Sequence, residues 1–86
     1  MEKVEILDTF NRLGYIIQEP TEKDKTYFLI KHTDKGTKMI YLKLKKKFLQ
    51  VEVLFNFNIG ELTKSEDKLI SEFAANLGYS IYKILK

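Results

Sequence analysis

The chain has 86 residues, 44% of them hydrophobic, which is enough for one domain with one core (1–86) and too few for two. It contains no cysteine, which excludes disulfides, thiolate nucleophiles and sulfur-ligated zinc and suits a cytoplasmic location. Nine of its fifteen basic residues lie between Lys23 and Lys47 beside only two acids, so this segment carries +7 within a chain of net charge +3. A charge split of this size predicts one surface suited to a polyanion.

The first predicted element is a helix over residues 2–13. Apolar side chains recur there at helical spacing, and Glu2, Glu5 and Asp8 place negative charge in the early turns, where the helix dipole favours it. Gly14 is expected to end this helix in the left-handed conformation, because the aromatic residue after it completes a common capping pattern. A short strand should follow over residues 15–19.

Three longer strands are predicted before the second helix. Residues 26–33 and 38–45 flank the segment 34–36, whose Gly36 suits a hairpin turn. Apolar residues occupy even positions in 38–45 but odd positions from Leu49 onward. Side chains on a strand alternate faces, so the chain must turn or bulge near Lys46 and Lys47 before the third of these strands.

A second helix is predicted to begin after Thr63, because Thr63 and Glu66 match the capping-box pattern. An apolar stripe continues from there to Leu77. Gly78 is expected to end this helix as Gly14 ends the first, and a last strand should occupy residues 79–84.

The predicted order is therefore α-β-β-β-β-α-β. We interpret it as an α+β two-layer sandwich, in which an antiparallel sheet carries both helices on one face. The sheet residues expected beneath the helices are Phe28, Ile30, Ile40, Leu42, Leu44, Val51, Val53 and Phe55. Those expected on the open face are Tyr27, Leu29, Lys31, Met39, Tyr41, Lys43, Lys45, Gln50, Glu52, Leu54 and Asn56.

This open face predicts a small binding module with RNA or single-stranded DNA as its partner. Lysines supply charges for phosphates, and tyrosines supply rings on which unpaired bases stack. Arg12 is the only arginine, so binding should be weakly sequence-selective. Lysine and tyrosine are also common on solvated sheet faces, which leaves an ordinary surface as an alternative. The candidate nucleic-acid-binding residues are Tyr27, Lys31, Lys38, Tyr41, Lys43, Lys45, Lys46 and Lys47.

The alternative function is that of a small protein-interaction or inhibitor protein. The run 53–57 is too apolar for a strand with one wet face unless something covers part of it. Leu29, Tyr41 and Leu54 would form an apolar patch with a charged rim, the usual arrangement of a modest protein contact. Such a patch would take a protein partner or pair two copies as a homodimer.

We predict no catalytic, metal-binding or cofactor-binding residue, and expect the protein not to be an enzyme. His32 lies at a strand end with no acid or nucleophile placed beside it. One histidine without cysteine argues against zinc, and the four glycines form no phosphate-binding loop. A membrane partner is not expected either, because residues 1–5 lack the apolar core of a signal peptide and the apolar runs are too short for a span.

The element order up to the second helix resembles the double-stranded-RNA-binding fold and the HicA-type RNase toxins that share it. The resemblance covers most of the chain and implies an α-β-β-β-α arrangement, apart from one short extra strand. It assigns no site residue here. Residues 63–68 are charge-balanced where the RNA-binding domains carry a lysine cluster, and Lys25-Thr26-Tyr27 stands where the toxins carry a catalytic histidine.

Overall fold

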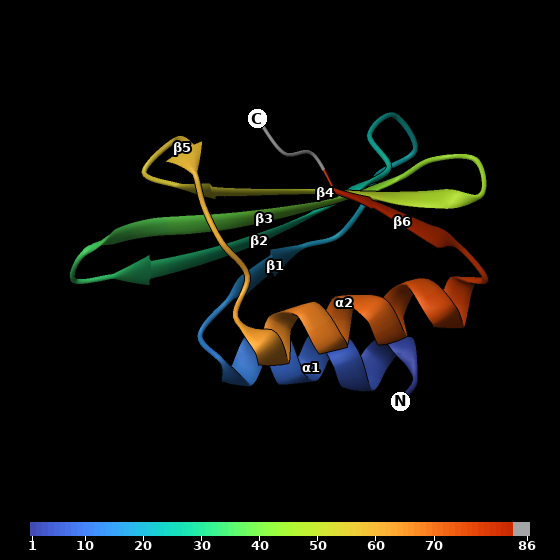
Figure 1. The fold of residues 1–86 in the computed structure, drawn as a ribbon, viewed down its shortest axis with the longest axis horizontal. Helices are drawn as coiled ribbons and strands as arrows, with labels where there is room; N and C mark the ends of the chain where they lie inside the picture. The colour runs from blue at the N-terminus through green and yellow to red at the C-terminus, as the bar shows by residue number, and fades with distance from the viewer. Residues whose placement is uncertain (84–86) are drawn as a thin grey trace.

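Two helices cover one face of a six-stranded sheet in the computed structural model, which describes residues 1–83 (Figure 1). The predicted α+β sandwich with both helices in one layer is confirmed. Residue 84, the expected end of the last strand, and residues 85–86 of the expected domain lie outside the described residues. In chain order the elements are α1 (Lys3–Arg12), β1 (Ile16–Gln18), β2 (Thr26–Thr33), β3 (Gly36–Leu44), β4 (Phe48–Phe55), β5 (Asn58–Ile59), α2 (Lys64–Leu77) and β6 (Ser80–Lys83).

The helix ends and the turn between β3 and β4 follow the sequence signals. At the start of α2, the Glu66 N–H donates to the Thr63 hydroxyl at 3.1 Å, and the Thr63 N–H donates to the Glu66 carboxylate at 3.0 Å. Gly78 ends α2 in the left-handed conformation with φ 70°, and Gly14 follows α1 with φ 101°. Lys47 also has a positive φ, in the turn that the change of parity predicts.

The sheet is a meander in the order β1-β2-β3-β4-β5, and these neighbours are antiparallel. β6 returns to the far edge of β4 and pairs with it in parallel, so that Lys83 lies beside Val51. β5 uses the same edge of β4 further along, where Ile59 pairs with Leu54. The two-residue β5 and the parallel pairing of β6 are additions to the prediction, because such short elements carry no clear periodicity.

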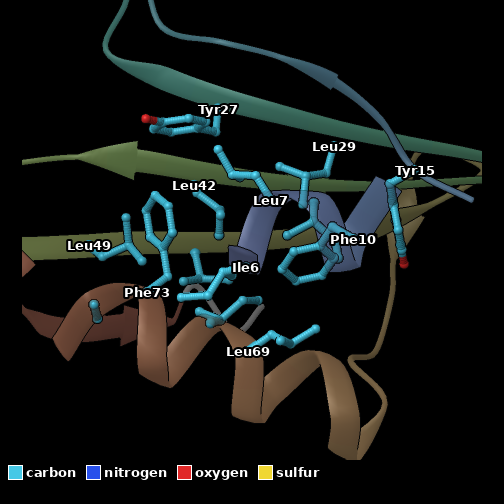
Figure 2. Packing of buried hydrophobic residues seen from close by; sticks show 14 residues of the cluster. Ile6, Leu7, Phe10, Tyr15, Tyr27, Leu29, Leu42, Leu49, Leu69 and Phe73 are labelled. Carbon is cyan, nitrogen blue, oxygen red and sulfur yellow. The ribbon is translucent and has the colours of Figure 1, made fainter. Parts of the chain in front are cut away.

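The core lies between the helices and the inner face of the sheet (Figure 2). Helix α1 contributes Phe10, and α2 contributes Phe73, whose ring meets the Tyr27 ring edge-on with 5.2 Å between centroids. The buried hydrophobic side chains are Ile6, Leu7, Phe10, Tyr15, Tyr27, Leu29, Ile40, Leu42, Leu49, Val51, Leu69, Ile70, Phe73 and Ala74.

Strand β2 faces the opposite way from the prediction. Tyr27 and Leu29 point into the core and are 4% and 0% exposed. Phe28 and Ile30, which were expected in the core, lie half-buried on the open face. The prediction placed even positions of β2 and β3 on the same face, and this was wrong.

The hairpin register explains the reversal. Thr33 pairs with Gly36 across a two-residue loop, so odd positions of β2 lie opposite even positions of β3 and share their face. Leu29 therefore sits beside Ile40. Because β2 is apolar at both parities, its own sequence cannot decide which side faces the helices.

Candidate functional site

No helix of residues 1–83 covers the second face of the sheet (Figure 1). Paired residues on neighbouring strands face the same side, so the side chains of this open face form cross-strand rows. One row crosses four strands and consists of Gln18, Phe28, Tyr41 and Glu52. The next row, which we call the apolar row, crosses five strands and consists of Ile16, Ile30, Met39, Leu54 and Ile59.

Lysines gather at one end of the sheet, beside the open face, where two connections meet. The Leu44 N–H donates to the Lys25 carbonyl at 2.8 Å, which holds the β1–β2 connection against the end of β3. The β3–β4 turn follows directly after that contact. We call these six lysines the basic end: Lys23, Lys25, Lys43, Lys45, Lys46 and Lys47. All are exposed except Lys45, which is half-buried.

A shallow hollow of about 160 Å³ lies on the open face next to the basic end. Its wall is aromatic, because the Phe28 and Tyr41 rings meet edge-on with 5.2 Å between centroids. Its remaining groups are two carboxylates, an amide, a hydroxyl and an ammonium, which can accept from and donate to a polar ring. The lining residues are Asp24, Thr26, Phe28, Tyr41, Lys43, Gln50 and Glu52.

A second aromatic pair continues this surface toward the edge of the sheet. Tyr82 on β6 lies beside Gln50, and its ring meets the Phe48 ring with 6.0 Å between centroids. Tyr82 is 58% exposed and therefore accessible from solvent. The hollow and this pair are adjacent because Gln50 borders both.

Five of the predicted nucleic-acid-binding residues lie in or beside this site. Tyr41 and Lys43 line the hollow, and Lys45, Lys46 and Lys47 form the neighbouring end of β3 and its turn. Tyr41 and Lys43 were predicted on this face from the alternation of β3, which the structure keeps.

Tyr27, Lys31 and Lys38 are the exceptions. All three lie on the helix-facing side of the sheet. Lys31 shares the parity of the buried Leu29, and Lys38 pairs with Lys31. Tyr27 is a core residue. The Lys31 ammonium lies 5.6 Å from the centre of the Tyr15 ring, a cation–π contact with a buried aromatic.

Lys38 belongs to a buried polar network. Its ammonium lies 2.6 Å from Glu66 Oε1, and the Tyr15 hydroxyl donates to Glu66 Oε2 at 2.5 Å. Glu66 is 4% exposed and Tyr15 is 1% exposed. The network joins β3, the start of α2 and the turn after α1, so we assign it to the stability of the fold.

Each pKa shift in this network has a physical cause. Burial raises the pKa of the Tyr15 hydroxyl, and the hydrogen bond to Glu66 and its negative charge raise it further. Burial also acts to raise the pKa of Glu66, but the hydrogen bonds from Lys38, Tyr15 and the Thr63 N–H outweigh it and lower the pKa. Glu66 therefore stays ionised while it is buried.

The predicted apolar patch is rearranged by the same reversal of β2. Leu29 lies in the core and is replaced on the open face by Ile30. Leu54 stays on that face within the apolar row, and Tyr41 lies in the neighbouring row. Ile16 and Ile59, at the two ends of the apolar row, are 63% and 58% exposed.

Three residues that line the hollow were not predicted from the sequence: Asp24, Thr26 and Phe28. The prediction placed Phe28 beneath the helices, whereas it lies on the open face. Thr26 has the same parity as Phe28 and faces the same side. Asp24 lies in a connection whose path no periodicity indicates. Only the length of the hairpin loop carries a signal for Phe28, because a two-residue loop fixes the relative parity of the strands.

Three further observations concern other kinds of site. Among residues 1–83, no group of three or more His, Cys, Asp and Glu side chains could hold a metal ion. His32 is exposed, and its Nδ1 lies 3.1 Å from the Thr37 hydroxyl across the hairpin. Neither described helix combines the length and the apolar character that a membrane crossing needs.

Comparison of the chain with protein-family models, curated proteins and solved structures gave no match in any of the three. Its function is therefore inferred from the residues and their arrangement.

Proposed function

We propose that this protein is a non-enzymatic module that binds single-stranded RNA or DNA through the hollow and the basic end. One observation carries the proposal: Lys43 belongs to both features, so the aromatic hollow borders the end of the sheet where the lysines gather. A cysteine-free chain suits the reducing cytoplasm, where we place this activity.

The basic end supplies the affinity for phosphates. Its six lysines are accompanied by three nearby acids, Glu22 and Asp24 in the connection and Glu52 in the hollow, so the positive charge dominates. Each phosphate contact to a single strand contributes about 0.7 to the slope of log affinity against log salt. Binding should therefore weaken steeply as salt increases.

The hollow supplies a place for one base. Its volume of about 160 Å³ suits a single planar ring. Stacking on an aromatic side chain contributes about 1–3 kcal/mol per base in a sequence-tolerant way. The Asp24 and Glu52 carboxylates can accept hydrogen bonds from exocyclic amino groups, which favours bases that carry them over uracil or thymine.

Fluorescence anisotropy of a labelled single strand tests this proposal over a series of salt concentrations. Lys43→Glu should weaken binding to all sequences and flatten the salt dependence, because a phosphate contact is lost. Lys68→Glu is the matched control, since it makes the same charge change on the exposed side of α2. Wild-type binding that is absent at low salt, or that does not depend on salt, would reject the proposal.

A second candidate function is a protein contact through the apolar row. The observation that favours it is an unbroken line of five apolar side chains across the open face. Met39→Lys places a charge at the middle of this row. It should abolish capture of a protein partner and leave nucleic-acid binding unchanged or slightly stronger, whereas equal capture by the variant would remove this candidate.

A further inference from the structure

Phe57 occupies a position that a bulky side chain normally avoids. The β4–β5 hairpin has a two-residue loop, Asn56-Phe57, in which both residues have positive φ, 50° and 66°. This combination is the pattern of a type I′ turn, for which Asn-Gly is the preferred pair. An aromatic residue at the second position is a strained outlier.

The two residues of this turn differ in what holds them. The Asn56 amide accepts a hydrogen bond from the Thr37 N–H at 2.9 Å, which ties the β4–β5 turn to the β2–β3 hairpin. Phe57 is 79% exposed, the most exposed of the large hydrophobic side chains among residues 1–83. Contacts within residues 1–83 thus explain Asn56 and do not explain a phenylalanine at position 57.

An open cleft of about 380 Å³ lies near this turn, at the same edge of the sheet. Its apolar part comes from β4 and from the segment that joins β5 to α2. Its charged residues are two acids and two lysines, of which Asp67 and Lys83 form an ion pair at 2.6 Å. The lining residues are Val51, Val53, Ile59, Gly60, Glu61, Leu62, Thr63, Lys64, Asp67 and Lys83.

The turn and the cleft lie on opposite sides of Ile59 along the edge. Ile59 pairs with Leu54 of β4. In one direction along β4, the cleft residues Val53 and Val51 lie one and three residues from Leu54. Phe57 lies at the turn, two to three residues away in the other direction. At about 3.4 Å per residue, both displacements are on the order of 10 Å or less.

We propose that this edge is a homodimer interface, in which Phe57 of each copy enters the cleft of the other. A twofold axis near Ile59 reverses the direction of the edge, so the turn of one copy meets the cleft of its partner in both directions at once. Among residues 1–83, the strand partner of β5 is β4. In the dimer, the outer edge of β5 would lie antiparallel to β5 of the second copy.

The charges fit a second copy of this chain. The cleft is balanced, with two lysines and two acids. The basic end lies at the other end of β4, about 20 Å from Leu54. Two copies joined at β5 therefore keep their basic ends apart, so both stay available for a polyanion. This inference stands on residues outside the proposed nucleic-acid site.

Sedimentation of the wild type at protein concentrations up to about 1 mM tests the proposal, and a reversible monomer–dimer equilibrium is expected. Phe57→Gly restores the preferred turn pair, so this variant should stay monomeric with a melting temperature no lower than that of the wild type. Val4→Glu, which changes a side chain 64% exposed on α1, is the control and should dimerise normally. A monomeric wild type, or dimerisation by Phe57→Gly equal to that of the wild type, would overturn the proposal.

Residue 59 tests the position of the axis. Because Ile59 would meet its own copy, Ile59→Glu and Ile59→Lys should each remain monomeric, whereas an equimolar mixture of the two should form a heterodimer. A mixture that remains monomeric would contradict a twofold axis at this residue. Met39→Lys, at the middle of the apolar row, should dimerise like the wild type, and its failure to do so would move the interface to the open face.

Discussion

The two faces of the sheet carry the same residue types with different roles. Tyr27 and Tyr41 lie on neighbouring strands, yet Tyr27 is buried in the core and Tyr41 borders the hollow. Lys38 and Lys43 lie on the same strand, yet Lys38 pairs with the buried Glu66 and Lys43 is exposed. In this protein, residue type alone does not show which face a side chain occupies; the parity of each residue within the hairpin does.

The largest effect of this difference should appear at the buried ion pair. Glu66→Gln removes the carboxylate and leaves the Lys38 ammonium, on a side chain only 15% exposed, without its counter-charge, which should lower the free energy of unfolding by about 3–5 kcal/mol. Lys43→Gln, on the opposite face, should change it by less than about 0.5 kcal/mol. Urea denaturation measures both, and equal losses would show that the two lysines do not differ in their contribution to stability.

Neighbouring residues of β2 test the assignment of faces directly. Leu29→Ala removes a side chain that is 0% exposed and should cost about 2–5 kcal/mol of stability. Ile30→Ala acts on a half-buried side chain of the open face and should cost about 1 kcal/mol. If Ile30→Ala proved the more destabilising of the two in urea, the register of the hairpin would have to be revised.

The sequence signals succeeded where one pattern dominates. The capping box at Thr63, the left-handed Gly78 and the turn at Lys46–Lys47 each depend on a few adjacent residues. The orientation of β2 failed because that strand is apolar at both parities, so the face is set by the loop that joins it to β3. The hollow was only partly predictable, since Asp24 reaches it from an irregular connection.

The pH dependence of stability should separate the buried network from the open face. The pKa of Glu66 is lowered from its ordinary value of 4.5, so the unfolded chain binds this proton more readily than the folded one. The stabilisation by Glu66 is therefore complete above pH 4.5 and is lost as the pH falls through the pKa of the folded state.

Denaturation of the wild type and Glu66→Gln between about pH 7 and pH 3 measures this loss. The difference in stability between the two proteins should shrink toward the acid end. A difference that is constant or larger at low pH would show that the Glu66 carboxylate does not supply it.

A smaller effect than at the buried ion pair is expected at the helix ends. A side chain added at Gly78 meets nothing within 4 Å, so the cost of Gly78→Val is that of φ 70° for a β-branched residue, about 1–2 kcal/mol. Gly14→Val, at φ 101°, should cost a similar amount. Both should bind single strands as the wild type does, and unchanged thermal melting in both would contradict their capping role.

The proposed function requires that a single strand bind the open face at the hollow and the basic end. The most direct measurement is a titration of the ¹⁵N-labelled protein with a short single-stranded oligonucleotide, followed by amide chemical shifts. We predict that the shifts concentrate at Thr26, Tyr41, Lys43 and Gln50 and in the Lys45–Lys47 turn, and that they diminish as salt is added. Shifts confined to α1 and α2, or no shifts at low salt, would contradict the account.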